Sequence, residues 1–137
     1  MSKNSSNGNH TTRLSTLLST RDIGQRGEDR AARFLQKQGL VVIARNVRCR
    51  GGEIDLVCQH GKSLVFVEVR LRRSAAYGGA AASITASKQR RIVLAARHYL
   101  AAHASADNDC RFDCVLIEGG DDSAIVWERD AFAAPVD

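Results

Sequence analysis

Residues 52–70 of the chain read GEIDLVCQHGKSLVFVEVR. Two runs rich in β-branched residues flank the tripeptide His60-Gly61-Lys62, a composition typical of two strands joined by a tight turn. If Gly61 takes the first central position of a type II′ turn, His60 faces Ser63 across the hairpin. The residue numbers of every facing pair then add up to 123.

This register places two carboxylates directly across from each other. Asp55 faces Glu68, Glu53 faces Arg70, and alternation along the strands puts all four side chains on one face. Opposed carboxylates repel each other, and a divalent cation between them makes the arrangement favourable. Mg²⁺ takes one or two carboxylates together with waters and phosphate, and Arg70 is placed to hold a phosphate oxygen. The opposite face is expected to be core and carries Ile54, Leu56, Val65, Val67 and Val69.

Two structural alternatives explain the same residues without a metal. Glu53 and Arg70 form an ordinary cross-strand ion pair, or Asp55 and Glu68 face water on a sheet that is covered on one side only. A different turn also shifts the pairing.

A helix is expected over residues 20–38, with Gly39 as its stop. At about 100° per residue, one face of this helix collects small and apolar side chains. These are Gly24, Gly27, Ala31, Phe34 and Leu35. Glu28 falls on the same face, where a carboxylate needs a cation or a partner. Glu28 is therefore a third acid for the site, or else it pairs with Arg45 or Arg48 at the helix flank.

The rest of the chain predicts further elements of both kinds. Strands are expected over residues 40–47, 52–59, 63–70, 111–118 and 124–128, a second helix over 85–103, connections over 48–52 and 71–83, and a turn over 119–122. The core face of the second helix comprises Ile92, Val93, Ala96, Tyr99 and Leu100. This order predicts an α/β fold with a mixed sheet flanked by helices. The polar residues 1–19 are expected to form a disordered tail, which leaves residues 20–137 as a single domain.

Composition sets the class of protein. The net charge is +5, and residues 21–111 hold seventeen Lys and Arg against eight acids, which suggests a polyanionic partner. No apolar run reaches the roughly 20 residues that span a bilayer, and the N-terminus has no apolar signal region, so we expect a cytoplasmic protein without a membrane partner. The four cysteines form no C-x-x-C pair, which favours buried reduced thiols over a zinc site.

Several motifs together resemble one known family. Gly27-Glu28, the run GEIDLV at 52–57 and the run VFVEVR at 65–70 resemble the YraN family, which is similar to the PD-(D/E)xK, or restriction-endonuclease-like, superfamily. Later stretches also resemble it, and the resemblance covers residues 22–133. These are Tyr77-Gly78-Gly79, Ser83, Ser87-Lys88-Gln89 and Arg111-Phe112-Asp113.

The resemblance implies an αβββαβ core and a site like that of archaeal Holliday-junction resolvases. Asp55 and Glu68 correspond to the two metal ligands, and Glu28 to the helix glutamate that binds the metal or its water. Arg70 stands where the superfamily usually has Lys. Because Arg stays protonated, it stabilises charge but does not deprotonate water. Ile54 replaces the superfamily's Pro at a backbone position.

We therefore expect an endonuclease that hydrolyses phosphodiester bonds in DNA with Mg²⁺ or Mn²⁺. Its catalytic residues are Glu28, Asp55, Glu68 and Arg70, and the three acids bind the metal. Phosphate contacts are assigned to Arg48, Arg50, Arg72, Arg73, Lys88, Gln89 and Arg91. For each of the basic residues, a solvated charged surface is the alternative, and for Gln89 the alternative is a structural amide.

Aromatic residues make up only 5% of the chain, which favours duplex or branched DNA over stacked single strands. A non-catalytic nucleic-acid-binding module that retains the fold is the alternative, and a protein that docks an acidic partner is the third hypothesis. Related resolvases are dimers, so a homodimer is an expectation from the resemblance alone.

Overall fold

The computed structural model describes residues 20–72, 84–103, 109–118 and 125–134. Its elements are α2 (Thr20–Lys37), β1 (Val41–Cys49), β2 (Gly52–His60), β3 (Ser63–Arg72), α3 (Ala86–His103), β4 (Asp109–Glu118) and β5 (Ile125–Phe132). The predicted order of helix, three strands, helix and two strands is confirmed. The predicted tail and the predicted turn over 119–122 lie outside the described residues, as does most of the predicted connection over 71–83.

All five strands are longer than the sequence predicted, and β4 begins two residues earlier, at Asp109. β1 continues through Cys49, so the predicted connection over 48–52 contracts to a tight turn in which Gly51 takes a φ of 84°. β3 gains two residues and β5 runs on to Phe132. Apolar patterning misses such strand ends because pairing of backbone groups sets them, and Arg48 pairs with Glu53 in the ladder whatever its polarity.

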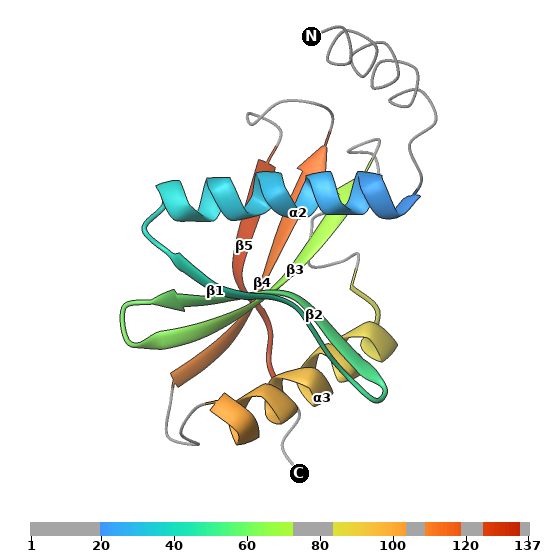
Figure 1. Ribbon diagram of the computed structural model, residues 1–137, viewed down its shortest axis with the longest axis vertical. Coiled ribbons are helices and arrows are strands. Elements are labelled where there is room, and N and C mark those ends of the chain that lie inside the picture. The colour runs from blue at the N-terminus through green and yellow to red at the C-terminus, as the bar shows by residue number, and fades with distance from the viewer. Residues whose placement is uncertain (1–19, 73–83, 104–108, 119–124, 135–137) are drawn as a thin grey trace, which may run out of the picture.

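The five strands form one mixed sheet in the order β1-β2-β3-β4-β5. Neighbours are antiparallel except β3 and β4, which are parallel because the chain passes through α3 between them. Helix α2 covers one face of the sheet and α3 covers the other (Figure 1). Among the helices of the described part, none is both long and apolar enough to cross a membrane.

The sheet has a hydrophobic core on each face. The core under α2 contains Leu35, Leu56 and Val67, and the core under α3 contains Phe66 and Ile92. A sheet covered on both faces excludes the alternative in which Asp55 and Glu68 face water on an open side. The predicted core positions on α3 are buried, apart from the partly buried Leu100. None of the four cysteines, all of which the structure describes, forms a disulfide. Cys58 and Cys114 are buried as predicted, whereas Cys110 is exposed, so the prediction of buried thiols is wrong for Cys110.

The predicted hairpin register is confirmed from His60↔Ser63 to Leu56↔Val67. Gly61 takes a φ of 62°, as the first central residue of a type II′ turn requires. The prediction that Ile54 and Leu56 share a face is wrong, since Ile54 packs in the α3-side core and Leu56 in the α2-side core.

The regular alternation of side chains between the two faces of the sheet is interrupted in β2 at Asp55. The β1 ladder pairs Leu56 with Arg45 and Ile54 with Val47, and between these pairs Asn46 takes a φ of 51°. A left-handed residue in a strand breaks the regular pleat, so the simple alternation of side chains does not carry across it.

Two glycines are required by the fold, Gly52 by the close approach of α3 and Gly39 by its backbone conformation. A Cβ on Gly52 would lie 2.5 Å from the Arg91 carbonyl oxygen and 2.9 Å from the Ala95 nitrogen, so only glycine lets α3 sit on β2. Gly39, with a φ of 96°, ends α2 as predicted.

Candidate functional site

Asp55 and Glu68 meet where β2 and β3 part. The recorded ladder between these strands ends at Leu56↔Val67, and the Val69 N–H then donates to Asp55 Oδ2 at 2.8 Å. A side-chain oxygen thus takes the place of the next backbone acceptor, which holds the Asp55 carboxyl against β3. Glu68 is only 3% exposed and shares a hydrogen bond with Asp55. The two carboxyl groups therefore lie side by side as predicted, at the position that follows the last recorded pair of the ladder.

The close approach makes both carboxyl groups harder to ionise. Burial and the neighbouring Asp55 carboxylate raise the pKa of Glu68 to about 7. Burial also raises the pKa of Asp55, which the Val69 N–H and the hydrogen bond from Glu68 oppose. Both groups therefore resist ionisation more than ordinary acids do, because two negative charges at this place repel each other.

Two cations approach the same oxygen of Glu68. Lys88 Nζ lies 3.0 Å from Glu68 Oε2, and Arg70 Nη1 lies 3.9 Å from it. The predicted pair of Glu53 and Arg70 is wrong. Glu53 instead accepts from Arg48 Nε at 3.3 Å across β1 and β2, because the break at the end of the β2–β3 ladder leaves Glu53 facing β1.

A small cavity lies against the acidic pair. Its volume is about 20 Å³, and Glu53, Asp55, Glu68, Lys88, Arg91 and Ile92 line it. A polar space of this size holds about one water molecule. The cavity therefore admits one small oxygen ligand or a bare cation, and no larger group without movement of a side chain.

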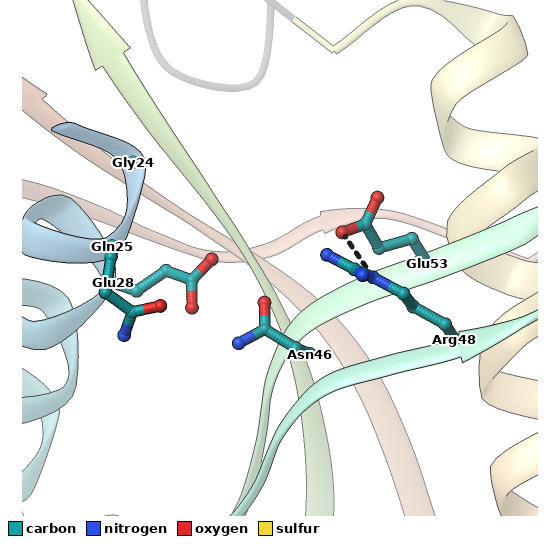
Figure 2. Close-up of a pocket in the computed structure, with 6 residues that line it drawn as sticks. All are labelled: Gly24, Gln25, Glu28, Asn46, Arg48 and Glu53. Carbon is teal, nitrogen blue, oxygen red and sulfur yellow. Dashed lines mark hydrogen bonds and ion pairs between the residues drawn. The ribbon is translucent and has the colours of Figure 1, made fainter. Parts of the chain in front are cut away.

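Glu28 lines a second, larger cavity of about 350 Å³ (Figure 2). Figure 2 shows its carboxyl group projecting from α2 toward Asn46 of β1, which hydrogen-bonds it. The Glu28 Oε1 atom is buried and has no hydrogen-bond partner among the described residues. Burial and the nearby Asp55 carboxylate raise the pKa of Glu28. An unsatisfied buried oxygen of this kind calls for a cation or a donor from a ligand.

Glu53 lines both cavities, so they adjoin at this residue. Within residues 20–72, 84–103, 109–118 and 125–134, no three His, Cys, Asp or Glu side chains gather closely enough to hold a metal ion. The structure thus joins Asp55 to Glu68 and leaves Glu28 as a neighbour that acts on Asp55 through its charge. The three-acid metal set stays a prediction.

The predicted phosphate contacts divide into several groups. Arg48 lines the larger cavity and Arg91 the smaller one, and both are exposed, while Arg50 is exposed in the turn between β1 and β2. Gln89 donates to the Ile84 carbonyl oxygen at 3.1 Å, which confirms the structural alternative for this amide. For Arg72 the structure describes only the backbone, at the end of β3, and Arg73 lies outside the described residues.

Sequence reasoning missed two features of the site. Asn46, which hydrogen-bonds Glu28, carried no signal because it reads as a polar residue within a strand. Lys88 was assigned to phosphate alone, although it contacts Glu68 from a helix twenty residues further along the chain. Only the packing of α3 against the sheet brings these two side chains together.

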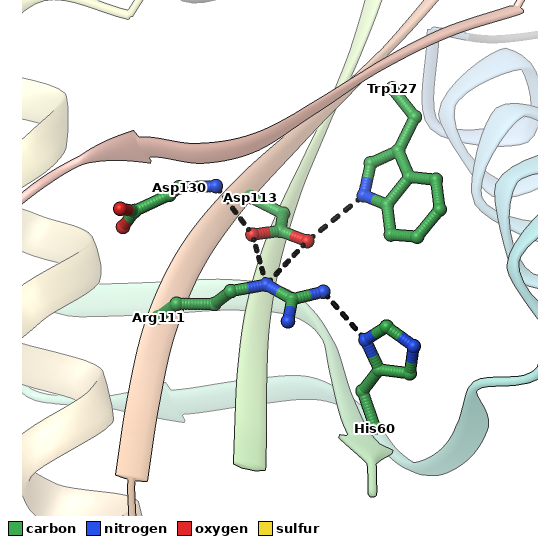
Figure 3. Close-up of polar contacts among 5 residues, drawn as sticks. All are labelled: His60, Arg111, Asp113, Trp127 and Asp130. Carbon is green, nitrogen blue, oxygen red and sulfur yellow. Dashed lines mark hydrogen bonds and ion pairs between the residues drawn. The ribbon is translucent and has the colours of Figure 1, made fainter.

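A second polar cluster has a structural role. Asp113 is fully buried in β4, and Arg111 Nε donates to its two oxygens at 3.0 and 3.2 Å (Figure 3). The Trp127 indole N–H and the Asp130 backbone N–H also donate to it, each at 2.9 Å. Arg111 in turn donates to His60 Nδ1. All oxygens of Asp113 are satisfied, so the cluster fastens β5 to β4 where their register shifts.

Comparison with known proteins identifies the family. The model of the uncharacterised protein family UPF0102 matches residues 27–117. A UPF0102 protein of Dechloromonas aromatica (strain RCB) is 60% identical over 111 residues, which are 81% of this chain and 88% of that protein. A UPF0102 protein of Methylobacillus flagellatus is 54% identical over 114 residues, 83% of this chain and 99% of that protein. The matched region includes Glu28, Asp55 and Glu68. The chain therefore belongs to the UPF0102 family, whose members are YraN-like.

Proposed function

We propose that this chain is a divalent-metal-dependent DNA endonuclease with a restriction-endonuclease-like core. The observation that carries the proposal is the buried Asp55–Glu68 pair at the point where two strands part. Such a pair costs stability unless a cation or proton compensates it, so its presence favours a function over a structural role. The element order of helix, three strands, helix and strand agrees with the αβββαβ core that the resemblance implies.

The side chains present fit a divalent cation. Two adjacent carboxylates with open space beside them are hard oxygen ligands of the kind that Mg²⁺ and Mn²⁺ accept, with waters and phosphate completing the shell. The ammonium of Lys88 already occupies a position 3.0 Å from Glu68 Oε2, and a metal ion would take over this contact with a positive charge. Asp55 and Glu68 would hold the ion, and the unsatisfied Glu28 Oε1 marks the side from which a third ligand or an ordered water would come. When bound, the ion would lower the pKa of water and neutralise phosphate charge.

The remaining residues of the site act on the DNA. The reaction adds water across a phosphodiester bond, so that a P–O bond forms, the bond to the leaving oxygen breaks and that oxygen takes a proton. Arg70, 34% exposed at the rim, offers a permanent charge to the phosphoryl oxygens. Arg48, Arg50 and Arg91 position the backbone without reading sequence.

One observation favours the alternative, a nucleic-acid-binding module without catalysis. Arg70 replaces the Lys of the superfamily, and an Arg at that place does not accept a proton from water. A binding module would keep the arginine-rich surface and its salt dependence while showing no turnover.

A cleavage assay separates these functions. Forked, four-way and linear DNA are incubated with the full chain in Mg²⁺ or Mn²⁺, and Glu68→Gln serves as the control. We expect metal-dependent cleavage that falls by at least about 100-fold in the variant. DNA binding without cleavage on any of the three DNAs refutes the nuclease and leaves the binding module.

Metal titration by calorimetry is the second measurement. We expect Asp55→Asn and Glu68→Gln to remove Mn²⁺ binding while circular dichroism shows an intact fold. Unchanged affinity in both variants rules out this metal site.

Arg72→Ala and Arg73→Ala are expected to weaken DNA binding and to flatten its dependence on salt by about one ion each. Unchanged slopes remove these two residues from the contact surface.

A further inference from the structure

We infer that Lys88 is the mobile cation of the proposed site: it neutralises Glu68 in the metal-free protein and turns to the substrate phosphate when a divalent ion occupies Glu68. The inference rests on the proposed function and deepens it, because it assigns the charge that the superfamily supplies from a Lys at the position of Arg70. Lys88 thereby becomes a catalytic residue rather than one of several surface contacts.

The geometry ranks Lys88 ahead of Arg70. Its ammonium lies 3.0 Å from Glu68 Oε2, within hydrogen-bond distance, whereas the guanidinium of Arg70 lies 3.9 Å from the same atom. Lys88 lines the cavity beside the two carboxyl groups, and Arg70 does not. An ammonium is also a compact charge with three donors, which suits movement between an acid and a phosphate better than a planar fork does.

The position of Lys88 on α3 is unfavourable for the helix itself. The Thr85 hydroxyl accepts from the Lys88 N–H at 3.1 Å, and the Gln89 N–H donates to the Thr85 carbonyl oxygen at 2.9 Å. Thr85 therefore caps the helix and Lys88 lies in its first turn. A cation there faces the positive end of the helix dipole, and acids are the preferred residues at such positions. The interaction with Glu68 offsets this disadvantage.

The side chain of Lys88 can turn away from Glu68 while its backbone stays in place. Its backbone is held by the hydrogen bond to Thr85, but its side chain is 40% exposed and joins the site through a flexible four-carbon stem. Glu68, in contrast, is buried on a central strand and stays in place. When one partner of an ion pair is fixed and the other reaches solvent, the exposed partner is the one that leaves.

The cavity makes that departure necessary. About 20 Å³ is available beside Asp55 and Glu68, and a divalent ion that keeps several waters needs more room than this. The ion and the ammonium also repel each other at the same oxygen. Withdrawal of the Lys88 side chain therefore opens the space and leaves a positive charge at its rim, where the phosphate binds.

Mutagenesis of Lys88 with two readouts tests the inference. Lys88→Met keeps the length of the side chain without the charge, Lys88→Arg restores the charge, and Lys62→Met in the exposed β2–β3 turn is the matched control. In calorimetry on the full chain, we expect Lys88→Met to bind Mn²⁺ about tenfold more tightly than the wild type, because no ammonium competes for Glu68. Lys88→Arg and Lys62→Met are expected to bind Mn²⁺ as the wild type does.

The second readout is cleavage. We expect Lys88→Met to lower kcat by about 100-fold with little change in KM, and Lys88→Arg to recover part of the loss. Unchanged Mn²⁺ affinity or unchanged kcat in Lys88→Met overturns the inference. If the wild type cleaves and Lys88→Met matches Lys62→Met, the inference alone fails. If the wild type cleaves none of the DNAs, the proposed function fails and the inference fails with it.

Discussion

Replacing Glu68 by Gln should make the protein more stable at alkaline pH, although it removes a central residue of the proposed site. In the wild type, Glu68 is buried beside Asp55, and both burial and that carboxylate oppose its ionisation. The folded protein therefore holds the Glu68 proton more tightly than the unfolded chain does. Gln has the same shape and carries no charge, so it does not pay this penalty at any pH.

The pKa values give the size and the direction of the effect. Glu68 has a pKa of about 7 in the fold against its ordinary value of 4.5. At about 1.4 kcal/mol for each pH unit, this difference amounts to about 3 kcal/mol. The stabilisation from the bound proton is complete below pH 4.5 and is lost as the pH rises through 7. The advantage of Glu68→Gln should thus be close to zero at pH 4.5 and about 3 kcal/mol at pH 8.5.

Urea unfolding at both pH values measures the difference. Trp127, whose indole hydrogen-bonds the buried Asp113, reports unfolding by fluorescence. Glu53→Gln is the matched control, because it makes the same chemical change at a half-buried position on the neighbouring strand. If Glu68→Gln has equal effects at pH 4.5 and 8.5, or destabilises the fold at pH 8.5, burial beside Asp55 does not raise the pKa of Glu68.

Three further predictions concern the frame around the site. Gly52→Ala should destabilise the fold by about 2 kcal/mol in thermal unfolding, because the new Cβ meets backbone atoms of α3, whereas Gly24→Ala, with open space around it, should stabilise α2 by about 1 kcal/mol. Equal effects would argue against the tight contact. Asp113→Asn should cost about 3 kcal/mol in urea unfolding, because it removes the buried charge that compensates the partly buried guanidinium of Arg111; a loss below about 1 kcal/mol would show that the cluster is dispensable. Burial raises the pKa of Cys58 and Cys114 to about 12, so both should resist a disulfide reagent at pH 8 until urea is added, and rapid labelling of either contradicts their burial.

Much of the frame was predictable because it depends on local patterns. The turn chemistry of His60-Gly61-Lys62 sets the register of the hairpin, and that register predicted that Asp55 and Glu68 lie across from each other. The predicted face of Ile54 was wrong, because the left-handed Asn46 on the neighbouring strand interrupts the alternation of side chains. No pattern in the sequence marks this Asn as left-handed. The alternative that pairs Glu53 with Arg70 was wrong because the β2–β3 ladder ends at Leu56↔Val67 and Glu53 pairs with Arg48 of β1 instead.

The sequence by itself determined which acids exist, which elements carry them and how one hairpin pairs, because helix period, strand alternation and turn type act over a few residues. The tertiary structure decided that Lys88 of α3 reaches Glu68, that Glu28 lines a cavity with an unsatisfied oxygen, and that Glu53 lines both this cavity and the smaller one beside the acidic pair. Those arrangements depend on how two helices settle on opposite faces of a twisted sheet. Contacts of that kind join residues far apart in the chain, and no local pattern encodes the distance between them.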